Sequence, residues 1–225
     1  MKKPFVLDPN GPPRPADKYD APRLMADKAP LGFHVMIKPA GSACNLNCTY
    51  CFYLSKATLA GGPGAKKMSD VTLERLIRSY IEDVTTPEVV FTWQGGEPTL
   101  RGLDFFRNVV VLQQKYAKPG QTVLNDLQTN GTLIDEQWCR FLKKNDFLVG
   151  LSIDGPEHLH DAYRKTRNGS PTFHKVFRAA KLLRRFGVPA CFTIQVMSNS
   201  MNRAGPLVAG LPPNKKDRPR EKEPG

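Results

Sequence analysis

Residues 34–51 of this 225-residue chain read HVMIKPAGSACNLNCTYC. The apolar residues at its start are typical of a short strand over residues 34–38, and the Gly, Ser and Asn that follow are typical of a loop. Cys44, Cys48 and Cys51 lie in that loop with the spacing C-x3-C-x2-C. Three thiols so close together, directly after a strand, predict that this loop holds a metal centre.

The number of thiols narrows the kind of metal centre. A structural zinc site normally has four ligands, usually as two pairs, and Cys139 and Cys191 offer no paired spacing that would complete one. A [4Fe–4S] cluster has four irons, each usually held by one cysteine. Three cysteines leave one iron open to another ligand, which makes such a cluster a reagent and not only an electron store. Three unliganded thiols on a flexible loop are the plainer alternative.

The rest of the chain alternates between strand and helix patterns. Strands are predicted over residues 34–38, 89–93, 122–127, 147–153 and 190–197, and helices over residues 70–83, 103–116, 134–144 and 173–186. This order predicts a parallel sheet with right-handed crossovers, so the carboxyl ends of the strands share one rim. Polar or glycine-rich segments follow four of the strands, at residues 44–51, 95–97, 128–131 and 152–155. We expect them to form one site at that rim.

Composition excludes several classes of protein. Lys and Arg number 33 against 21 Asp and Glu, a formal charge of +12, yet no dense basic run lies within residues 31–197. No run of 18 apolar residues is present, and the apolar part of the N-terminus is too short for a signal peptide. Five cysteines, three of them clustered, do not suit a secreted disulfide framework. We expect a protein of the reducing cytoplasm without a membrane segment.

Proline marks the two ends of the chain. Seven of the 20 prolines lie in residues 1–30 and five lie in residues 198–225. These counts predict an irregular N-terminal extension over residues 1–30, a folded body over residues 31–197, and a charged, disordered tail over residues 198–225.

Five sequence blocks carry a resemblance to a known family. In order they are CNLNCTYCFYL (44–54), FTWQGGEPTL (91–100), QTNGTL (128–133), VGLSIDGP (149–156) and HDAYR (160–164). The cysteine spacing, with Tyr50 before the third Cys, resembles that of radical S-adenosylmethionine (SAM) enzymes, and Gly95-Gly96-Glu97 resembles their GGE motif. Together the blocks resemble the anaerobic sulfatase-maturating enzymes over about residues 35–195.

The resemblance implies an α/β fold with a partial (β/α) barrel of the radical SAM type. We expect the barrel to be incomplete, with about five parallel strands and irregular N- and C-terminal extensions. It also implies that a [4Fe–4S] cluster is bound by Cys44, Cys48 and Cys51.

The resemblance implies a second cofactor, SAM. Its contacts would be Tyr50, Gly95, Ser152 and Arg164, with Gly96 and Glu97 in the supporting turn. Arg164 would meet the methionine carboxylate in a charge-assisted pair, Ser152 would offer its hydroxyl to polar groups of the ligand, and Tyr50 would contact the adenine. The peptide substrate would face Tyr53, Gln94 and Asn130.

The implied reaction oxidises a Cys or Ser side chain of a sulfatase to Cα-formylglycine. A 5′-deoxyadenosyl radical formed from SAM would remove a hydrogen atom from Cβ of that side chain, and loss of a proton and a second electron would follow. The implied partners are a sulfatase polypeptide as substrate and an electron donor protein. We expect no membrane partner and no nucleic acid.

The chain departs from the family pattern after residue 197. Family members continue with a last barrel strand, a domain that holds two further iron–sulfur clusters, and a carboxylate that takes up the proton of the substrate. Residues 198–225 contain no cysteine, and from about residue 207 they show no strand or helix pattern. We therefore expect a truncated or frame-shifted product that is weakly active or inactive, and we assign no catalytic residue.

Three other readings stay open on the sequence alone. One is a radical SAM maturase of another peptide or protein, and another is a remnant that binds a cluster without catalysis. The third is a non-enzymatic, zinc-stabilised, basic nucleic-acid-binding protein. The isolated cysteines and two histidines receive plain roles: we expect core packing for Cys139 and Cys191, and loop hydrogen bonding for His158 and His160.

Overall fold

A computed structural model describes residues 32–51, 53 and 67–193 of the chain. The expected N-terminal extension over residues 1–30, the expected tail over residues 198–225 and the second half of the last predicted strand lie outside the described residues.

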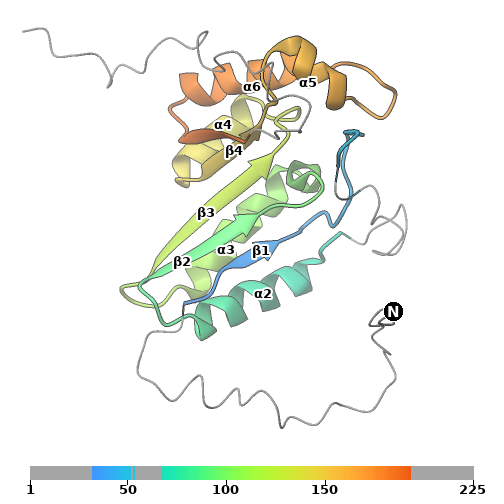
Figure 1. The fold of residues 1–225 in the computed structure, drawn as a ribbon. Coiled ribbons are helices and arrows are strands. Elements are labelled where there is room, and N and C mark those ends of the chain that lie inside the picture. Colours follow the sequence, from blue (N-terminus) through green and yellow to red (C-terminus); the bar gives the residue numbers. More distant parts are fainter. Residues whose placement is uncertain (1–31, 52, 54–66, 194–225) are drawn as a thin grey trace, which may run out of the picture.

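The described residues form a five-stranded parallel sheet (Figure 1). Its strands follow the chain in the order β1 (Val35–Ile37), β2 (Glu88–Trp93), β3 (Thr122–Thr129), β4 (Leu148–Ser152) and β5 (Ala190–Thr193). Each strand pairs with the next one in the sequence, and the described part of β1 and of β5 pairs with one strand only. The sheet is therefore open, which confirms the expected α/β fold of about five parallel strands.

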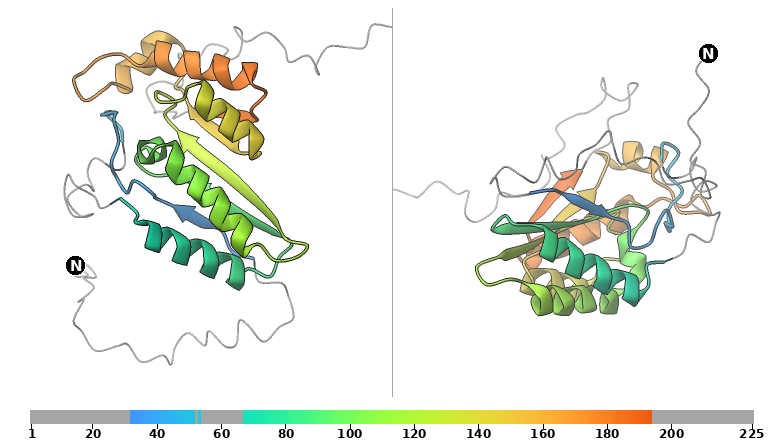
Figure 2. Two further views of the ribbon diagram at one scale, coloured as in Figure 1. Left: turned by 180° about the vertical axis from the view of Figure 1, so that it is seen from behind. Right: turned by 90° about the horizontal axis from the view of Figure 1, so that it is seen from below.

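Four helices connect the strands and cover one face of the sheet (Figure 2). They are α2 (Asp70–Asp83), α3 (Leu103–Tyr116), α4 (Glu136–Lys144) and α6 (Phe173–Arg185). The helix α2 begins where the sequence predicts it, because the Ser69 side chain accepts a hydrogen bond from the Thr72 N–H. Within the described part of the chain, no helix is both long and apolar enough to cross a membrane.

Three further features differ from the sequence-based expectations. The helix α4 begins at Glu136 and not at residue 134, because the Asp135 side chain caps it through the Trp138 N–H. Two short helices were not predicted: the 3-10 turn η2 (Pro98–Arg101) and α5 (Glu157–Tyr163). The helix α5 lies in a segment that was expected to be a loop, and it carries His160 into the interior.

The core lies between the helices and the sheet. In β2, Phe91 and Trp93 are fully buried, and Trp93 meets the rings of Phe105 and Phe106 on α3 at centroid distances of 6.2 and 5.7 Å. Burial of each such side chain contributes about 1.5–3 kcal/mol.

The two lone cysteines differ in their burial. Cys139 is buried in the core as expected. Cys191 is exposed, which corrects the expectation of core packing. The strand β5 is at the edge of the described sheet, where it pairs only with β4, and all four of its residues are exposed.

Candidate functional site

The three clustered cysteines sit on the loop that follows β1, with Cys48 buried and Cys44 and Cys51 half-buried. The pKa of the Cys48 thiol is raised to about 11, chiefly by burial and also by negative charge on Cys44 and Cys51, while the charge of Arg164 acts to lower it. The three sulfur atoms are thus close enough to influence one another's charge. A donor set of three mutually close thiols, with a cation beside one of them, fits an iron–sulfur cluster.

A single metal ion would need a tighter arrangement. Within residues 32–51, 53 and 67–193, no three His, Cys, Asp or Glu side chains stand close enough together to hold one metal ion. A cluster spreads its thiolates over several irons, whereas a structural zinc ion gathers four ligands at about 2.3 Å or less.

The glycine turn after β2 packs directly on the cysteine loop. Gly96 has a φ of +48°, and a Cβ added there would lie 2.2 Å from the carbonyl oxygen of Ala43. The same oxygen accepts a hydrogen bond from the Glu97 N–H at 2.8 Å. Glycine is needed at position 96 both for the left-handed backbone and for the close approach of the glycine turn to the cysteine loop.

The Glu97 carboxylate joins this turn to the end of β3. It is fully buried, and its Oε1 accepts hydrogen bonds from the Thr99 N–H and from the hydroxyls of Thr99 and Thr129. Its Oε2 accepts one from the Asn130 N–H at 2.7 Å. Burial raises the pKa of Glu97, and these donors oppose that shift. The side chain therefore supports the rim and does not reach into open space.

Asn130 lies against the cysteine loop. Its Nδ2 donates to Asn45 Oδ1 at 2.9 Å and lies 3.7 Å from the sulfur of Cys44, while Asn45 Nδ2 donates to Thr132 Oγ1 at 2.8 Å. The loop is held from the other side as well, since Arg167 Nε donates to the Cys44 carbonyl oxygen at 3.1 Å. The cysteine loop is thus fixed by residues that follow β2, β3 and α5.

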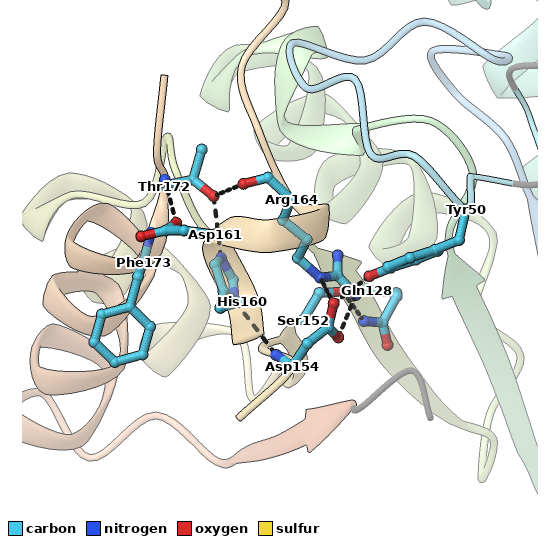
Figure 3. Close-up of polar contacts among 9 residues, drawn as sticks. All are labelled: Tyr50, Gln128, Ser152, Asp154, His160, Asp161, Arg164, Thr172 and Phe173. Carbon is cyan, nitrogen blue, oxygen red and sulfur yellow. Dashed lines mark hydrogen bonds and ion pairs between the residues drawn. The ribbon is translucent and has the colours of Figure 1, made fainter. Parts of the chain in front are cut away.

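Tyr50 and Arg164 meet at Asp154, which follows β4 (Figure 3). Arg164 Nε donates to Asp154 Oδ2 at 2.7 Å, and Arg164 Nη2 donates to Oδ1 at 3.0 Å. The Tyr50 hydroxyl donates to the same Oδ2. The guanidinium also lies 5.4 Å from the centroid of the Tyr50 ring. Two expected SAM contacts therefore converge on Asp154, which the sequence places in the rim segment 152–155 without indicating a role for it.

Ser152, at the end of β4, is linked to its neighbouring strands through Gln128. Gln128 Nε2 donates to Ser152 Oγ at 3.0 Å, and Gln128 Oε1 accepts from Thr193 Oγ1 at 2.9 Å. The side chain passes over Gly150, where a Cβ would lie 2.2 Å from Gln128 Oε1. Gln128 thus spans three strand ends on the face opposite the helices.

The remaining expected site residues lie around Lys38. Gly95 adopts a φ of +99° beside the Lys38 side chain, and the Lys38 ammonium lies 5.1 Å from the centroid of the Tyr53 ring. The Gln94 N–H donates to the Ile37 carbonyl oxygen at 2.9 Å, which continues the pairing of β2 with β1. The rim thus gathers residues from all four polar segments, as the order of elements predicts.

The chain belongs to the radical SAM superfamily, whose family model matches residues 39–203. Among curated proteins it is 46% identical over 174 residues to a serine-type anaerobic sulfatase-maturating enzyme of Bacteroides thetaiotaomicron, covering 77% of this chain and 41% of the relative. It is 45% identical over 166 residues to a cysteine-type anaerobic sulfatase-maturating enzyme of Clostridium perfringens, covering 74% of this chain and 45% of the relative.

A solved structure extends the likeness to three dimensions. The native enzyme anSMEcpe with bound AdoMet and Cp18Cys peptide is 43% identical to this chain, with a TM-score of 0.67, and the match covers 74% of this chain and 44% of that one. The chain spans less than half the length of each of these relatives.

Proposed function

We propose that this chain binds a [4Fe–4S] cluster and SAM at the rim of its sheet and takes part in the oxidation of a sulfatase Cys or Ser side chain to Cα-formylglycine. The observation that carries the proposal is the convergence of the cysteine loop with Arg164, Tyr50 and Ser152 at one rim. Membership of the superfamily and the names of the relatives support the choice of cofactors and of reaction.

Cys44, Cys48 and Cys51 would hold the cluster, and their number would leave one iron open to a ligand from outside the protein. When bound, the cluster supplies the electron that cleaves SAM reductively. Arg164 would bind the methionine carboxylate, because its pairing with Asp154 uses Nε and Nη2 and leaves Nη1 for another acceptor. Ser152 would orient the ligand through its hydroxyl, and Tyr50 would contact the adenine.

Gly95 and Gly96 would bring backbone groups close to the ligand, with Glu97 fixing the turn behind them. Tyr53, Gln94 and Asn130 would line the path of the peptide. The proposed substrate is a sulfatase segment that presents Cys or Ser, since the relatives include enzymes of both types and one structure contains a Cys peptide. An external electron donor and a reducing cytoplasm complete the proposal.

The test separates SAM cleavage from peptide oxidation. The full chain is reconstituted with iron and sulfide without oxygen, reduced with dithionite, and given SAM with a sulfatase-motif peptide carrying Cys, Ser or, as a control, Ala. We expect 5′-deoxyadenosine by chromatography, and formylglycine by mass spectrometry from the Cys or the Ser peptide but not from the Ala peptide.

Two outcomes would contradict the proposal at different points. SAM cleavage without change in either reactive peptide would overturn the substrate and favour a maturase of another peptide. A reconstituted chain that neither binds nor cleaves SAM would overturn the cofactor site.

A further inference from the structure

Asp154 occupies a central position in the rim that the proposed function leaves without a role. Its side chain and that of Arg164 are almost fully buried, with 5% and 10% of their surfaces exposed. Its carboxylate accepts both bonds of a bidentate pair from Arg164 and a bond from the Tyr50 hydroxyl (Figure 3). A buried arginine without a partner would be costly, so this carboxylate fixes the guanidinium in one orientation.

A second connection between Asp154 and Arg164 runs through His160. The Asp154 N–H faces His160 Nδ1 at 3.3 Å, and a backbone N–H can only donate, so Nδ1 must accept. The proton of the neutral imidazole then lies on Nε2, which donates to Thr172 Oγ1 at 3.0 Å. Thr172 Oγ1 donates in turn to the Arg164 carbonyl oxygen at 2.6 Å. Each donor in this series therefore points the same way, from Asp154 through His160 and Thr172 to the Arg164 carbonyl oxygen.

The far end of this connection is attached to the first turn of α6. Asp161 Oδ1 accepts hydrogen bonds from the N–H groups of Thr172 and Phe173 at 2.7 and 2.9 Å (Figure 3). Burial, and then the charge of Arg164, lower the pKa of His160, which agrees with the neutral imidazole that the hydrogen bonds require. Both the side chain and the backbone of Arg164 are thus held relative to Asp154.

We propose that Asp154 is a positioning residue for SAM, because it fixes the side chains of Arg164 and Tyr50 before the ligand binds. His160 and Thr172 hold the backbone groups of Asp154 and Arg164 in place. This role rests on the proposed function of Arg164 and Tyr50 as SAM contacts. The bidentate pair uses one edge of the guanidinium, so Nη1 and the second proton of Nη2 point toward the other edge, where a ligand carboxylate can bind. A preset arginine binds that carboxylate without losing side-chain freedom on binding.

The first test compares two ligands on the reconstituted full chain. The dissociation constants of SAM and of decarboxylated SAM are measured by anaerobic equilibrium dialysis for the wild type, Asp154→Asn and the exposed control Asp104→Asn. We expect Asp154→Asn to weaken SAM about tenfold or more and the analogue less than about threefold, with no change in the control. An equal loss for both ligands, or unchanged or tighter SAM binding, would overturn the positioning role.

A second pair of variants decides the matter if Asp154→Asn fails to fold. Thr172→Val removes the hydroxyl that links His160 to the Arg164 backbone, and Thr172→Ser keeps it. We expect severalfold weaker SAM binding for Thr172→Val and near wild-type binding for Thr172→Ser. Equal affinities in the two variants contradict the role. If the wild type binds neither ligand, the proposed function itself fails, which is distinct from loss of the Asp154 effect alone.

Discussion

Glu97 shows how a single residue joins two loops of the rim. Each of its carboxylate oxygens faces a backbone N–H, from Thr99 on one side and from Asn130 on the other. An amide at this position would turn an NH₂ group toward one of these donors. We therefore expect Glu97→Gln to lower the free energy of unfolding by about 1–3 kcal/mol, measured by urea unfolding. The control Glu88→Gln, at an exposed strand start, should change it little, and equal losses would contradict the argument.

Gly96 tests the contact between the glycine turn and the cysteine loop. In Gly96→Ala, the alanine must adopt a left-handed φ and its Cβ clashes with the Ala43 carbonyl oxygen. In the control Gly120→Ala, the φ is also left-handed, at +78°, but no atom lies within 4 Å of the new Cβ. The control should cost about 1–2 kcal/mol. We expect Gly96→Ala to cost more and to lower the iron content after reconstitution. Equal stability losses with full iron content would show that this contact is unimportant.

Some residues of the candidate site stand out in the sequence and others do not. The three cysteines and the glycine turn stand out because each forms a short, closely spaced motif. The sequence places Asp154 in the rim segment 152–155 but indicates no role for it, because Asp-Gly-Pro after a strand is typical of a turn and its partner Tyr50 is 104 positions away. The burial of His160 was likewise missed, since a lone histidine near charged residues gives no sign of the hydrogen bonds to Asp154 and Thr172.

At the scale of elements, α5 provides a pH-dependent contribution to stability. Burial lowers the pKa of His160 below its ordinary 6.5, so the folded chain takes up this proton at lower pH than the unfolded chain does. Its contribution is fully present above about pH 6.5 and is lost as the pH falls from there through the folded pKa. We expect the free energy of unfolding to fall over this range, by no more than about 1.4 kcal/mol per pH unit.

Urea unfolding between about pH 7 and pH 5.5 measures this contribution, with His160→Gln as the comparison. The variant lacks the titrating imidazole, so its stability should change less with pH than that of the wild type. Identical pH dependence in the two proteins would mean that His160 is not held in the neutral state.

The bounds of the elements follow from local signals where these are strong. The helices α2 and α3 have the predicted bounds; α2 begins after the Ser69 cap, and α3 begins directly after Gly102. The helix α5 escaped prediction because its seven residues give too little periodicity, and because Pro156 and Gly155 before it indicate a loop. The exposure of β5 depends on which strands lie beside it, and periodicity within one segment does not contain that information.

At the scale of the whole molecule, the alternation of strands and helices is sufficient to predict that the four polar segments meet at one rim. A parallel sheet brings the ends of its strands to one rim, so segments separated by up to about a hundred residues become neighbours. The hydrogen bonds among the cysteine loop, the glycine turn and the ends of β3 and β4 confirm this arrangement. The charge of +12 carries no such information, because it depends on composition and not on position.

The iron and sulfide content of the anaerobically reconstituted chain, together with its absorbance near about 400 nm, tests the central claim most directly. Cys48→Ala removes a buried loop thiol, and Cys191→Ala removes an exposed thiol outside the loop. We predict about four iron and about four sulfide per chain in the wild type and in Cys191→Ala, and loss of both in Cys48→Ala. Zinc in place of iron, or the same cluster content in Cys48→Ala as in the wild type, would contradict the account.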